Sequence, residues 1–404
     1  MDRVILHCDC NSFFASVETA LNPAYRGVPM AVCGSQEDRH GIVLAKNDEA
    51  KRYGVKTAET VFSAKKKCPQ LVIASPHYKE YERYSRLVNR IYADYTDKIE
   101  PFGIDESWLD VTASRRVFGS GEEIAELIRQ RVKSELGITV SIGVSFNKPF
   151  AKLGSDYKKP DAITVISKEN FRQIVFPLPA SDLLYVGRKT AEQLEKIGVR
   201  TIGDLASCSR DMLRHRFGKM GNMLFEYANG LDESDVSPSD KNETKSIGNG
   251  FTFRHDLVTR EDCRVGIEFL CEEIGYKLRE RKLKCHTVAL TIKDTHLRTI
   301  QRQRPLSDSS DISREISDLA YMILCDEWSE NIPIRMLTVT VTGLVDASSS
   351  FTQLDLFSDD KADTRDKGRR REETIDNIRK RFGISSISTG AFYDTDIGID
   401  LNKD

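Results

Sequence analysis

The chain has 404 residues, more than one ordinary domain holds, so two to four domains are expected. Hydrophobic residues make up 39% and charged residues 30%, which is typical of a soluble globular protein with several cores. The net charge is −2, which excludes a chain that is basic throughout. A nucleic-acid partner would therefore need a basic surface concentrated in one region.

Membrane and secretory signals do not stand out in the sequence. No apolar run approaches the roughly 18 residues of a transmembrane helix. The N-terminus MDRVILHCDC lacks the small-residue cleavage site of a signal peptide and predicts a first strand instead. The nine cysteines are scattered without a CxxC pair, which favours reduced thiols. We therefore expect a cytoplasmic protein with no membrane partner.

The N-terminal half alternates strands and helices. A strand over residues 3–8 ends at Asp9, and helical spacing follows over 12–21. Residues 28–75 mix short strands with basic helices. Periodicity and β-branched runs then predict helices over 79–97 and 121–136 and strands over 138–146 and 162–166. The segment GIDESWLDVT, between the two helices, has the pattern of strand, turn and strand.

After about residue 170 the pattern changes to helices joined by glycine turns, as in LLYVGRKTAEQLEKIGVRTIGDLA. Residues 233–245 are polar with Pro and Ser, which predicts a linker. Strands and amphipathic helices alternate again over 246–345, which predicts an α+β module. Periodicity is lost over 346–360, and the charged tail contains one predicted helix near 366–382.

Three carboxylates in the first half of the chain, Asp9, Asp105 and Glu106, need a neutralising partner. Asp105 and Glu106 are adjacent in an apolar setting, where an unpaired buried charge is costly. If the strand that ends at Asp9 is their neighbour in one sheet, the three groups converge. Oxygen ligands without His or Cys suit Mg²⁺, and two such ions ~3.5–4 Å apart can clamp a phosphoryl displacement. Ordinary turn acids are the alternative, and we assign Asp110 to that class.

Long motifs carry a family resemblance over residues 4–345. In their order along the chain, VILHCDCNSFFASVE, GIDESWLDVT and SIGVSFNKPFAKLGSDYKKPDAITVI resemble the palm motifs of Y-family translesion DNA polymerases, in the bacterial DNA polymerase IV branch. The resemblance implies template-directed, error-prone DNA synthesis past damaged bases, without a proofreading exonuclease. It also implies an α+β multidomain fold shaped like a right hand, with a palm sheet (1–18 and 76–168), fingers (19–75), a helical thumb with a helix-hairpin-helix (169–235), a linker (236–245), an α+β little finger (246–345), and a clamp-binding segment with a charged tail (346–404).

The resemblance assigns the candidate active site as well. Asp9, Asp105 and Glu106 would be catalytic and, with the backbone carbonyl of Cys10, would hold two Mg²⁺ ions, for which Mn²⁺ can substitute. Phe14 would be the steric gate, a ring under the incoming sugar that leaves no room for a 2′-hydroxyl. The nucleotide-binding residues would be Phe13, Phe14, Asn47, Lys51 and Lys159, with Lys152 a weaker candidate that supports its helix. Taken alone, the phenylalanines fit a core and the lysines fit a solvated surface.

The fingers depart from the family pattern. A motif that resembles TANYEAR in relatives is AKNDEAK here, so that Asp48 replaces a tyrosine and Lys51 an arginine. Lys51 can act as a point charge but not as a bidentate fork. Because a carboxylate is repelled by a triphosphate, we expect Asp48 to point away from it or to pair with Lys51, Lys46 or Arg52.

Two regions are candidates for binding primer-template DNA. The helix–turn–helix with Gly187, Lys189 and Gly198 resembles a helix-hairpin-helix, which offers backbone N–H groups to a phosphate; a simple αα-hairpin is the alternative. Residues 277–304 contain nine basic and two acidic residues, a local net charge of +7. This run is either a solvated face or a phosphate-binding face, and we assign Arg279, Arg281, Lys282, Arg298 and Arg302 to DNA.

The pentapeptide QLDLF, residues 353–357, resembles the motif that binds the bacterial sliding clamp, with Gln353, Leu354, Leu356 and Phe357 as the contact residues. Exposed apolar residues in an aperiodic stretch favour a partner. The predicted partners are thus primer-template DNA, a deoxynucleoside triphosphate and the clamp, with the protein itself a monomer. A non-catalytic homologue that acts as a clamp-bound repair scaffold is one alternative, and a nucleotide cyclase with two metals is another.

Overall fold

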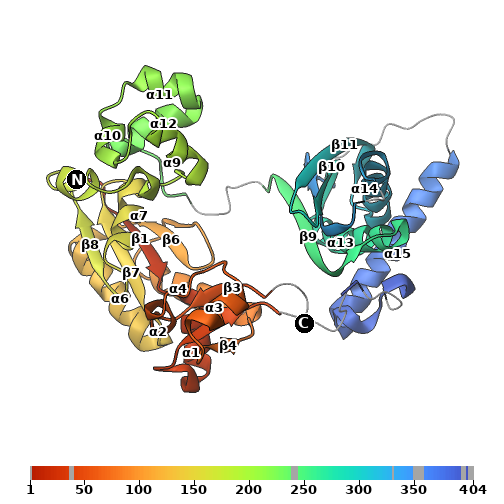
Figure 1. The fold of residues 1–404 in the computed structure, drawn as a ribbon, viewed down its shortest axis with the longest axis horizontal. Helices are drawn as coiled ribbons and strands as arrows, with labels where there is room; N and C mark the ends of the chain where they lie inside the picture. Colours follow the sequence, from red (N-terminus) through yellow and green to blue (C-terminus); the bar gives the residue numbers. More distant parts are fainter. Residues whose placement is uncertain are drawn as a thin grey trace. The chain divides into compact units, whose positions relative to one another are not determined.

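The computed structural model describes residues 2–35, 41–237, 244–329, 332–348, 359–392 and 397–398. The chain divides into two compact units, one made up of Met1–Gly34 and Ile42–Asn242 and the other of Ser35–Gly41 and Glu243–Asp404. Figure 1 shows the elements of both. Among the described residues, every helix is too short or too polar to cross a bilayer. None of the nine cysteines forms a disulfide.

A five-stranded central sheet organises the first unit, in the order β5-β6-β1-β7-β8. The strands are β1 (Ile5–Cys10), β5 (Ile99–Pro101), β6 (Glu106–Asp110), β7 (Val140–Ser145) and β8 (Ile163–Ile166). β1 is antiparallel to both β6 and β7, and β7 is parallel to β8. The predicted neighbourhood of the first strand and the GIDESWLDVT segment is therefore confirmed, with Asp9 directly opposite Glu106.

Helices cover both faces of the central sheet. Successive side chains of a strand point to opposite faces, and β1 follows this rule. Leu6, Cys8 and Cys10 are buried in the core shared with α4 (Tyr78–Ala93) and α6 (Gly121–Leu136). The alternate residues of β1, among them Asp9, face α7 (Lys148–Tyr157) on the other side (Figure 1). The strand pattern thus decides that Asp9 meets α7 and not the apolar core.

A smaller three-stranded sheet, in the order β3-β2-β4, follows the first helix α1 (Phe13–Leu21). Its elements are η1 (Pro23–Tyr25), β2 (Met30–Cys33), β3 (Val43–Lys46), α2 (Asp48–Arg52), α3 (Val61–Lys67) and β4 (Val72–Ala74). α1 joins the two sheets, because Phe14 packs against the core clusters of both. A short helix α5 (Arg115–Phe118) precedes α6.

The region after β8 is helical, as the glycine turns predicted. It contains α8 (Phe171–Val175), η2 (Ala180–Asp182), α9 (Arg188–Glu195), α10 (Ile202–Ala206), α11 (Arg210–Phe217) and α12 (Lys219–Ala228). The chain then returns to the central sheet, where Val236 is 4% exposed beside Ile5 and Trp108. The Ser237 amide donates to Glu100 at 2.8 Å. The first residues of the predicted linker are thus packed on the sheet.

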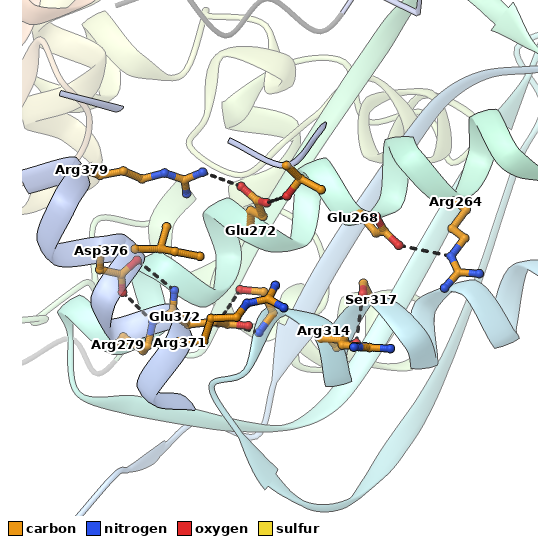
Figure 2. Close-up of a pocket in the computed structure, with 13 residues that line it drawn as sticks. Arg264, Glu268, Glu272, Arg279, Arg314, Ser317, Arg371, Glu372, Asp376 and Arg379 are labelled. Carbon is orange, nitrogen blue, oxygen red and sulfur yellow. Dashed lines mark hydrogen bonds and ion pairs between the residues drawn. The ribbon is translucent and has the colours of Figure 1, made fainter. Parts of the chain in front are cut away.

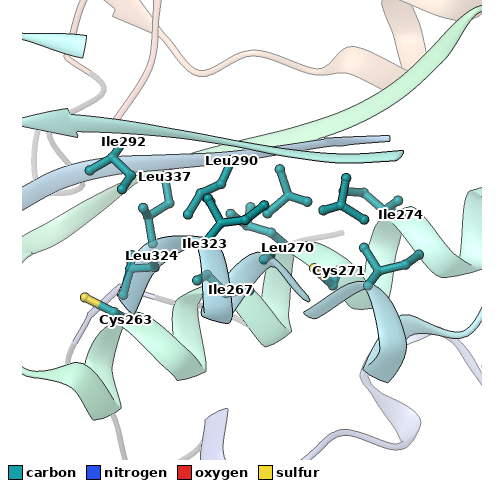
Figure 3. Packing of buried hydrophobic residues seen from close by; sticks show 14 of the residues in the cluster. Cys263, Ile267, Leu270, Cys271, Ile274, Leu290, Ile292, Ile323, Leu324 and Leu337 are labelled. Atoms are coloured by element: carbon teal, nitrogen blue, oxygen red, sulfur yellow. The ribbon is translucent and has the colours of Figure 1, made fainter. Parts of the chain in front are cut away.

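The second unit pairs a four-stranded antiparallel sheet with two helices. The order is β11-β10-β12-β9, with β9 (Ser246–Leu257), β10 (Leu283–Asp294), β11 (Thr299–Ser310) and β12 (Ile334–Thr342), and β13 (Val345–Asp346) pairs with the start of β10. α13 (Arg260–Glu280) and α14 (Ser313–Glu327) cover one face. Figure 3 shows Leu270 and Ile274 of α13 packed below Leu290 of β10.

A long C-terminal helix, α15 (Asp359–Phe382), belongs to the second unit and begins earlier than the helix predicted near 366–382. It is followed by η4 (Ile384–Ser386) and η5 (Gly390–Phe392). Phe392 is 3% exposed and lies in the same core cluster as α13 and α14. The tail, for which the sequence indicated no role, is therefore an integral part of this unit.

Candidate active site

Three carboxylates converge at one end of the central sheet. Asp9 is the next-to-last residue of β1, Glu106 begins β6, and Asp105 lies in the turn just before it. The backbone amide of Cys10 donates to the Asp105 carbonyl at 3.0 Å, which holds the turn against the strand. The sheet register therefore produces the cluster that the sequence predicted.

Two lysines from the α7 side of the sheet neutralise this cluster. The Lys152 ammonium lies 2.6 Å from Glu106 Oε2 and 3.2 Å from Asp9 Oδ2. The Lys159 ammonium, just after α7, lies 2.7 Å from the same Asp9 oxygen. Lys152, which the sequence suggested only as support for the helix, thus contacts two of the three acids.

A glycine contact lets α7 approach the sheet closely enough for these bonds. A Cβ at Gly143 of β7 would lie 1.9 Å from the Ala151 carbonyl oxygen, and one at Gly154 of α7 would lie 2.9 Å from the Gly143 Cα. No side chain fits in this space, so backbone packs on backbone. The helix turn that carries Lys152 is thereby held over the carboxylates.

His7 is a site residue that the sequence reading missed. Its buried ring places Nε2 3.4 Å from Glu106 Oε2, while Nδ1 lies 2.8 Å from the Ser155 hydroxyl of α7. Ser155 in turn donates to the Lys152 carbonyl at 2.8 Å. The available signal was the two-residue period, which puts His7 on the same face of β1 as Asp9.

The environment separates the pKa values of the two adjacent acids. Burial, reinforced by repulsion from Asp9 and Glu106, raises the pKa of Asp105 to about 6. Burial opposes ionisation of Glu106 too, but the nearby His7 ring and the hydrogen bond from the Lys152 ammonium outweigh it and lower the pKa of Glu106 to about 2. Asp105 is therefore the carboxylate whose negative charge is least compensated by the protein.

These residues fit a divalent cation. In the described part of the chain, no three His, Cys, Asp or Glu side chains already surround a common point. The Lys152 and Lys159 ammoniums bond to Glu106 and Asp9. Burial, and then repulsion from Asp9 and Glu106, raise the Asp105 pKa, so a bound cation would stabilise its ionised form. The donors are all oxygens, the set that Mg²⁺ prefers. The Cys10 side chain is 3% exposed in the core on the opposite face, so only its carbonyl oxygen remains a candidate ligand.

The two phenylalanines of α1 have different environments. Phe13 is 3% exposed within the core of the central sheet, so we remove it from the nucleotide-binding set. Phe14 is partly exposed at the junction of the two sheets, and its ring stacks on Tyr81 of α4 with 4.1 Å between centroids. Of the two, only Phe14 is placed to contact a ligand.

In the three-stranded sheet region, the side chain of Asn47 has a structural role. Its side-chain oxygen accepts from the amides of Ala50 and Met30, each at 3.0 Å, and its Nδ2 donates to Val28 at 2.7 Å. Because this amide caps α2, we remove Asn47 from the nucleotide-binding set. The expected pairing of Asp48 is confirmed, since its Oδ1 lies 2.7 Å from the Lys51 ammonium.

The hairpin of the helical region presents the predicted glycines at open positions. Gly187 caps the start of α9, and Gly198 has a φ of +82° in the turn before α10. A Cβ at either position would meet no atom within 4 Å. Lys189 is exposed in the first turn of α9. The backbone here is accessible to a large ligand.

Some of the basic residues of the run 277–304 in the second unit form ion pairs within the protein. Arg279 of α13 has a side chain only 10% exposed and faces α15, where it bonds Asp376 at 2.7 Å and also pairs with Glu372 (Figure 2). It cannot also contact DNA, so we remove it from the DNA-binding set. Arg302 pairs with Glu327 at 3.1 Å but remains 55% exposed. Arg281, Lys282 and Arg298 are exposed.

The clamp-motif residues 353–357 lie outside the described residues.

Three family models match the chain: the impB/mucB/samB family over residues 8–156, its C-terminal domain over 244–356, and the thumb domain of DNA polymerase-iota over 181–232. The solved structure of a chimeric Y-family DNA polymerase aligns with a TM-score of 0.75 at 23% identity, covering 85% of this chain and 99% of that one. The predicted α+β right-hand fold is therefore confirmed.

Curated relatives match over almost their full length. DNA polymerase IV of Acetivibrio thermocellus is 49% identical over 391 residues, which cover 96% of this chain and 97% of the relative. DNA polymerase IV of Clostridium kluyveri is 36% identical, with 97% and 98% coverage. DNA polymerase IV 1 of Bacillus subtilis is also 36% identical, with 96% and 93% coverage.

Proposed function

Because the chain belongs to the Y family of DNA polymerases, in the bacterial DNA polymerase IV branch, we propose that Asp9, Asp105 and Glu106 form its catalytic metal site. The protein is a DNA-directed DNA polymerase that acts in translesion synthesis, and its family depends on divalent metal ions. We also propose which residues hold the ions, which contact the nucleotide and which bind the DNA.

The metal assignment rests on one observation, the convergence of three carboxylates from β1 and the β5–β6 turn beside two lysines. Two Mg²⁺ ions, for which Mn²⁺ can substitute, would be held by the three acids and the Cys10 carbonyl. Bound there, they would activate the primer 3′-hydroxyl and offset charge on the triphosphate. No observation favours a non-catalytic scaffold.

Side chains around the carboxylates would position the reacting groups. Lys152 bonds Glu106 from the side of α7 at 2.6 Å, so that its carboxylate keeps one orientation, and the buried His7 ring packs beside it. Lys159, whose side chain is 35% exposed, pairs with Asp9 and Asp156 and would exchange these partners for the triphosphate. Phe14 lies at the junction of palm and fingers, where its ring would pack against C2′ of the sugar and exclude a 2′-hydroxyl.

Duplex DNA would be held without sequence readout. The open backbone at Gly187 and Gly198, with Lys189 beside it, suits a phosphate at the helix-hairpin-helix. In the little finger, Arg281, Lys282, Arg298 and Arg302 supply the exposed cations.

The remaining parts of the proposal concern partners and place. Gln353–Phe357 would bind the sliding clamp, the protein would act as a monomer, and DNA synthesis would place it in the cytoplasm. Deleting these five residues should abolish clamp-stimulated processivity and spare distributive synthesis on short primers. Surviving stimulation would contradict the motif assignment.

The metal site is tested by primer extension with Mg²⁺ on a damaged template. Asp105→Asn and Glu106→Gln should each abolish extension while DNA affinity, measured by fluorescence anisotropy, stays nearly unchanged. Asp110→Asn, at the far end of the same strand β6, is the matched control and should extend normally. Near-normal turnover of either site variant would overturn the assignment.

A further inference from the structure

A buried acid lies behind the candidate steric gate. Glu18, one helical turn after Phe14 on α1, has a side chain only 4% exposed. Burying a carboxylate is costly unless it is hydrogen-bonded. The hydrogen-bond partners of Glu18 therefore indicate its role. The metal site and the DNA-binding surfaces make no use of this residue.

Two residues of the α4 N-terminus bond this carboxylate. The Tyr81 hydroxyl donates to Glu18 Oε1 at 2.5 Å. His77 Nδ1 lies 2.9 and 3.1 Å from the two oxygens, and because a carboxylate only accepts, the ring nitrogen donates. Burial and the bond to Glu18 raise the pKa of Tyr81, which keeps its hydroxyl a donor.

The same tyrosine supports the gate. Tyr81 is fully buried, and its ring stacks on that of Phe14 with 4.1 Å between centroids and 11° between planes. Tyr78 adds an edge contact to each ring, at 6.1 Å to Phe14 and 5.8 Å to Tyr81. Phe14 therefore stacks on the Tyr81 ring, whose hydroxyl is bonded back to α1 through Glu18.

We propose that Tyr81 and Glu18 are positioning residues for the Phe14 gate, so that exclusion of ribonucleotides depends on a hydrogen bond made away from the sugar. The inference rests on the proposed role of Phe14. A ring packed on one side only can tilt, and a tilted gate leaves room for a 2′-hydroxyl. The bond from Tyr81 to Glu18 fixes the plane on which the gate rests.

The test compares kcat/KM for deoxy- and ribonucleotides on one primer-template. Tyr81→Phe keeps the stacked ring and removes only the hydroxyl, and it should cut discrimination by roughly threefold to tenfold, the scale of one lost hydrogen bond. Glu18→Gln still offers an acceptor oxygen and should retain most of the discrimination, whereas Glu18→Leu should lose it. Tyr84→Phe, three residues further along α4, is the matched control and should leave discrimination unchanged.

A purely structural role is separated by the double variant. If Tyr81 acts through the gate, Tyr81→Phe should have no further effect on discrimination in a Phe14→Val background. Equal losses in both backgrounds, or full discrimination in the single Tyr81→Phe variant with a normal melting temperature, would overturn the inference. Unchanged discrimination in Phe14→Val alone would instead overturn the proposed gate itself.

Discussion

At the scale of single residues, the lysines beside the carboxylates should have the largest effect on metal binding. Lys152 bonds two oxygens that we assign to metal ions, so the lysine and the ions compete for the same charge. Unit charges about 4 Å apart interact by roughly 1–4 kcal/mol near a protein surface. The protein without metal is stabilised by Lys152, whereas its metal affinity is reduced.

Lys152→Met should therefore lower the Mg²⁺ concentration that gives half-maximal extension by several-fold. The same variant without metal should melt at a lower temperature, because Asp9 and Glu106 lose a counter-charge. A Mg²⁺ titration of primer extension and a thermal melt in EDTA measure the two effects. A higher Mg²⁺ requirement would mean that Lys152 mainly orients Glu106.

Lys51 and Asp48 form a second competing pair. Their side chains are 43% and 48% exposed and lie 2.7 Å apart. Asp48→Asn should free Lys51 for the triphosphate and lower the nucleotide KM, while Lys51→Ala should raise it several-fold with little change in DNA affinity. Lys66→Ala, an exposed lysine of α3, is the control. Steady-state nucleotide titrations decide, and a normal KM for Lys51→Ala would remove Lys51 from the site.

At the scale of secondary-structure elements, the seating of α7 on β7 determines the site. Gly143→Ala would drive a methyl group into the Ala151 carbonyl, and overpacking of this kind costs about 1–3 kcal/mol or more. We expect lower stability and a loss of extension, because Lys152 moves off the carboxylates. Gly368→Ala in α15 meets no atom within 4 Å and should stabilise the helix by about 0.5–1 kcal/mol. Thermal melts of the two variants should shift in opposite directions.

The docking of α15 on α13 of the second unit depends on ion pairs with little solvent exposure. Arg279, Glu372 and Asp376 have side chains only 10–11% exposed, and Figure 2 shows them meeting between the helices. Removing one partner of such a pair costs about 3–5 kcal/mol. Asp376→Asn should therefore lower the melting temperature of the full-length protein clearly. Arg314→Ala, at a residue 74% exposed, should not. Equal, small shifts would show that α15 adds little to the domain.

At the scale of the whole molecule, DNA affinity should be governed by the exposed cations and should fall with salt. Replacing Arg281, Lys282 and Arg298 together by alanine should flatten the log–log salt dependence by up to about 2–3 units, ~0.9 for each lost phosphate contact. The acid content of the rest of the chain keeps the net charge at −2, so the effect is local. An unchanged slope in anisotropy titrations would show that these residues form an ordinary solvated surface and do not contact DNA phosphates.

The family, the order of elements and the three carboxylates can be predicted from the sequence, because period-two strands, helical periodicity and long motifs are local features of the chain. The pairing of Asp9 with Glu106 agrees with those motifs. Which polar residues remain available for a ligand depends on the folded structure. Asn47 caps a helix, Phe13 fills a core and Arg279 is tied to α15, while His7, Lys152, Glu18 and Tyr81 gain their contacts across elements. Hydrogen bonds and ion pairs between distant segments depend on packing, which no local pattern contains.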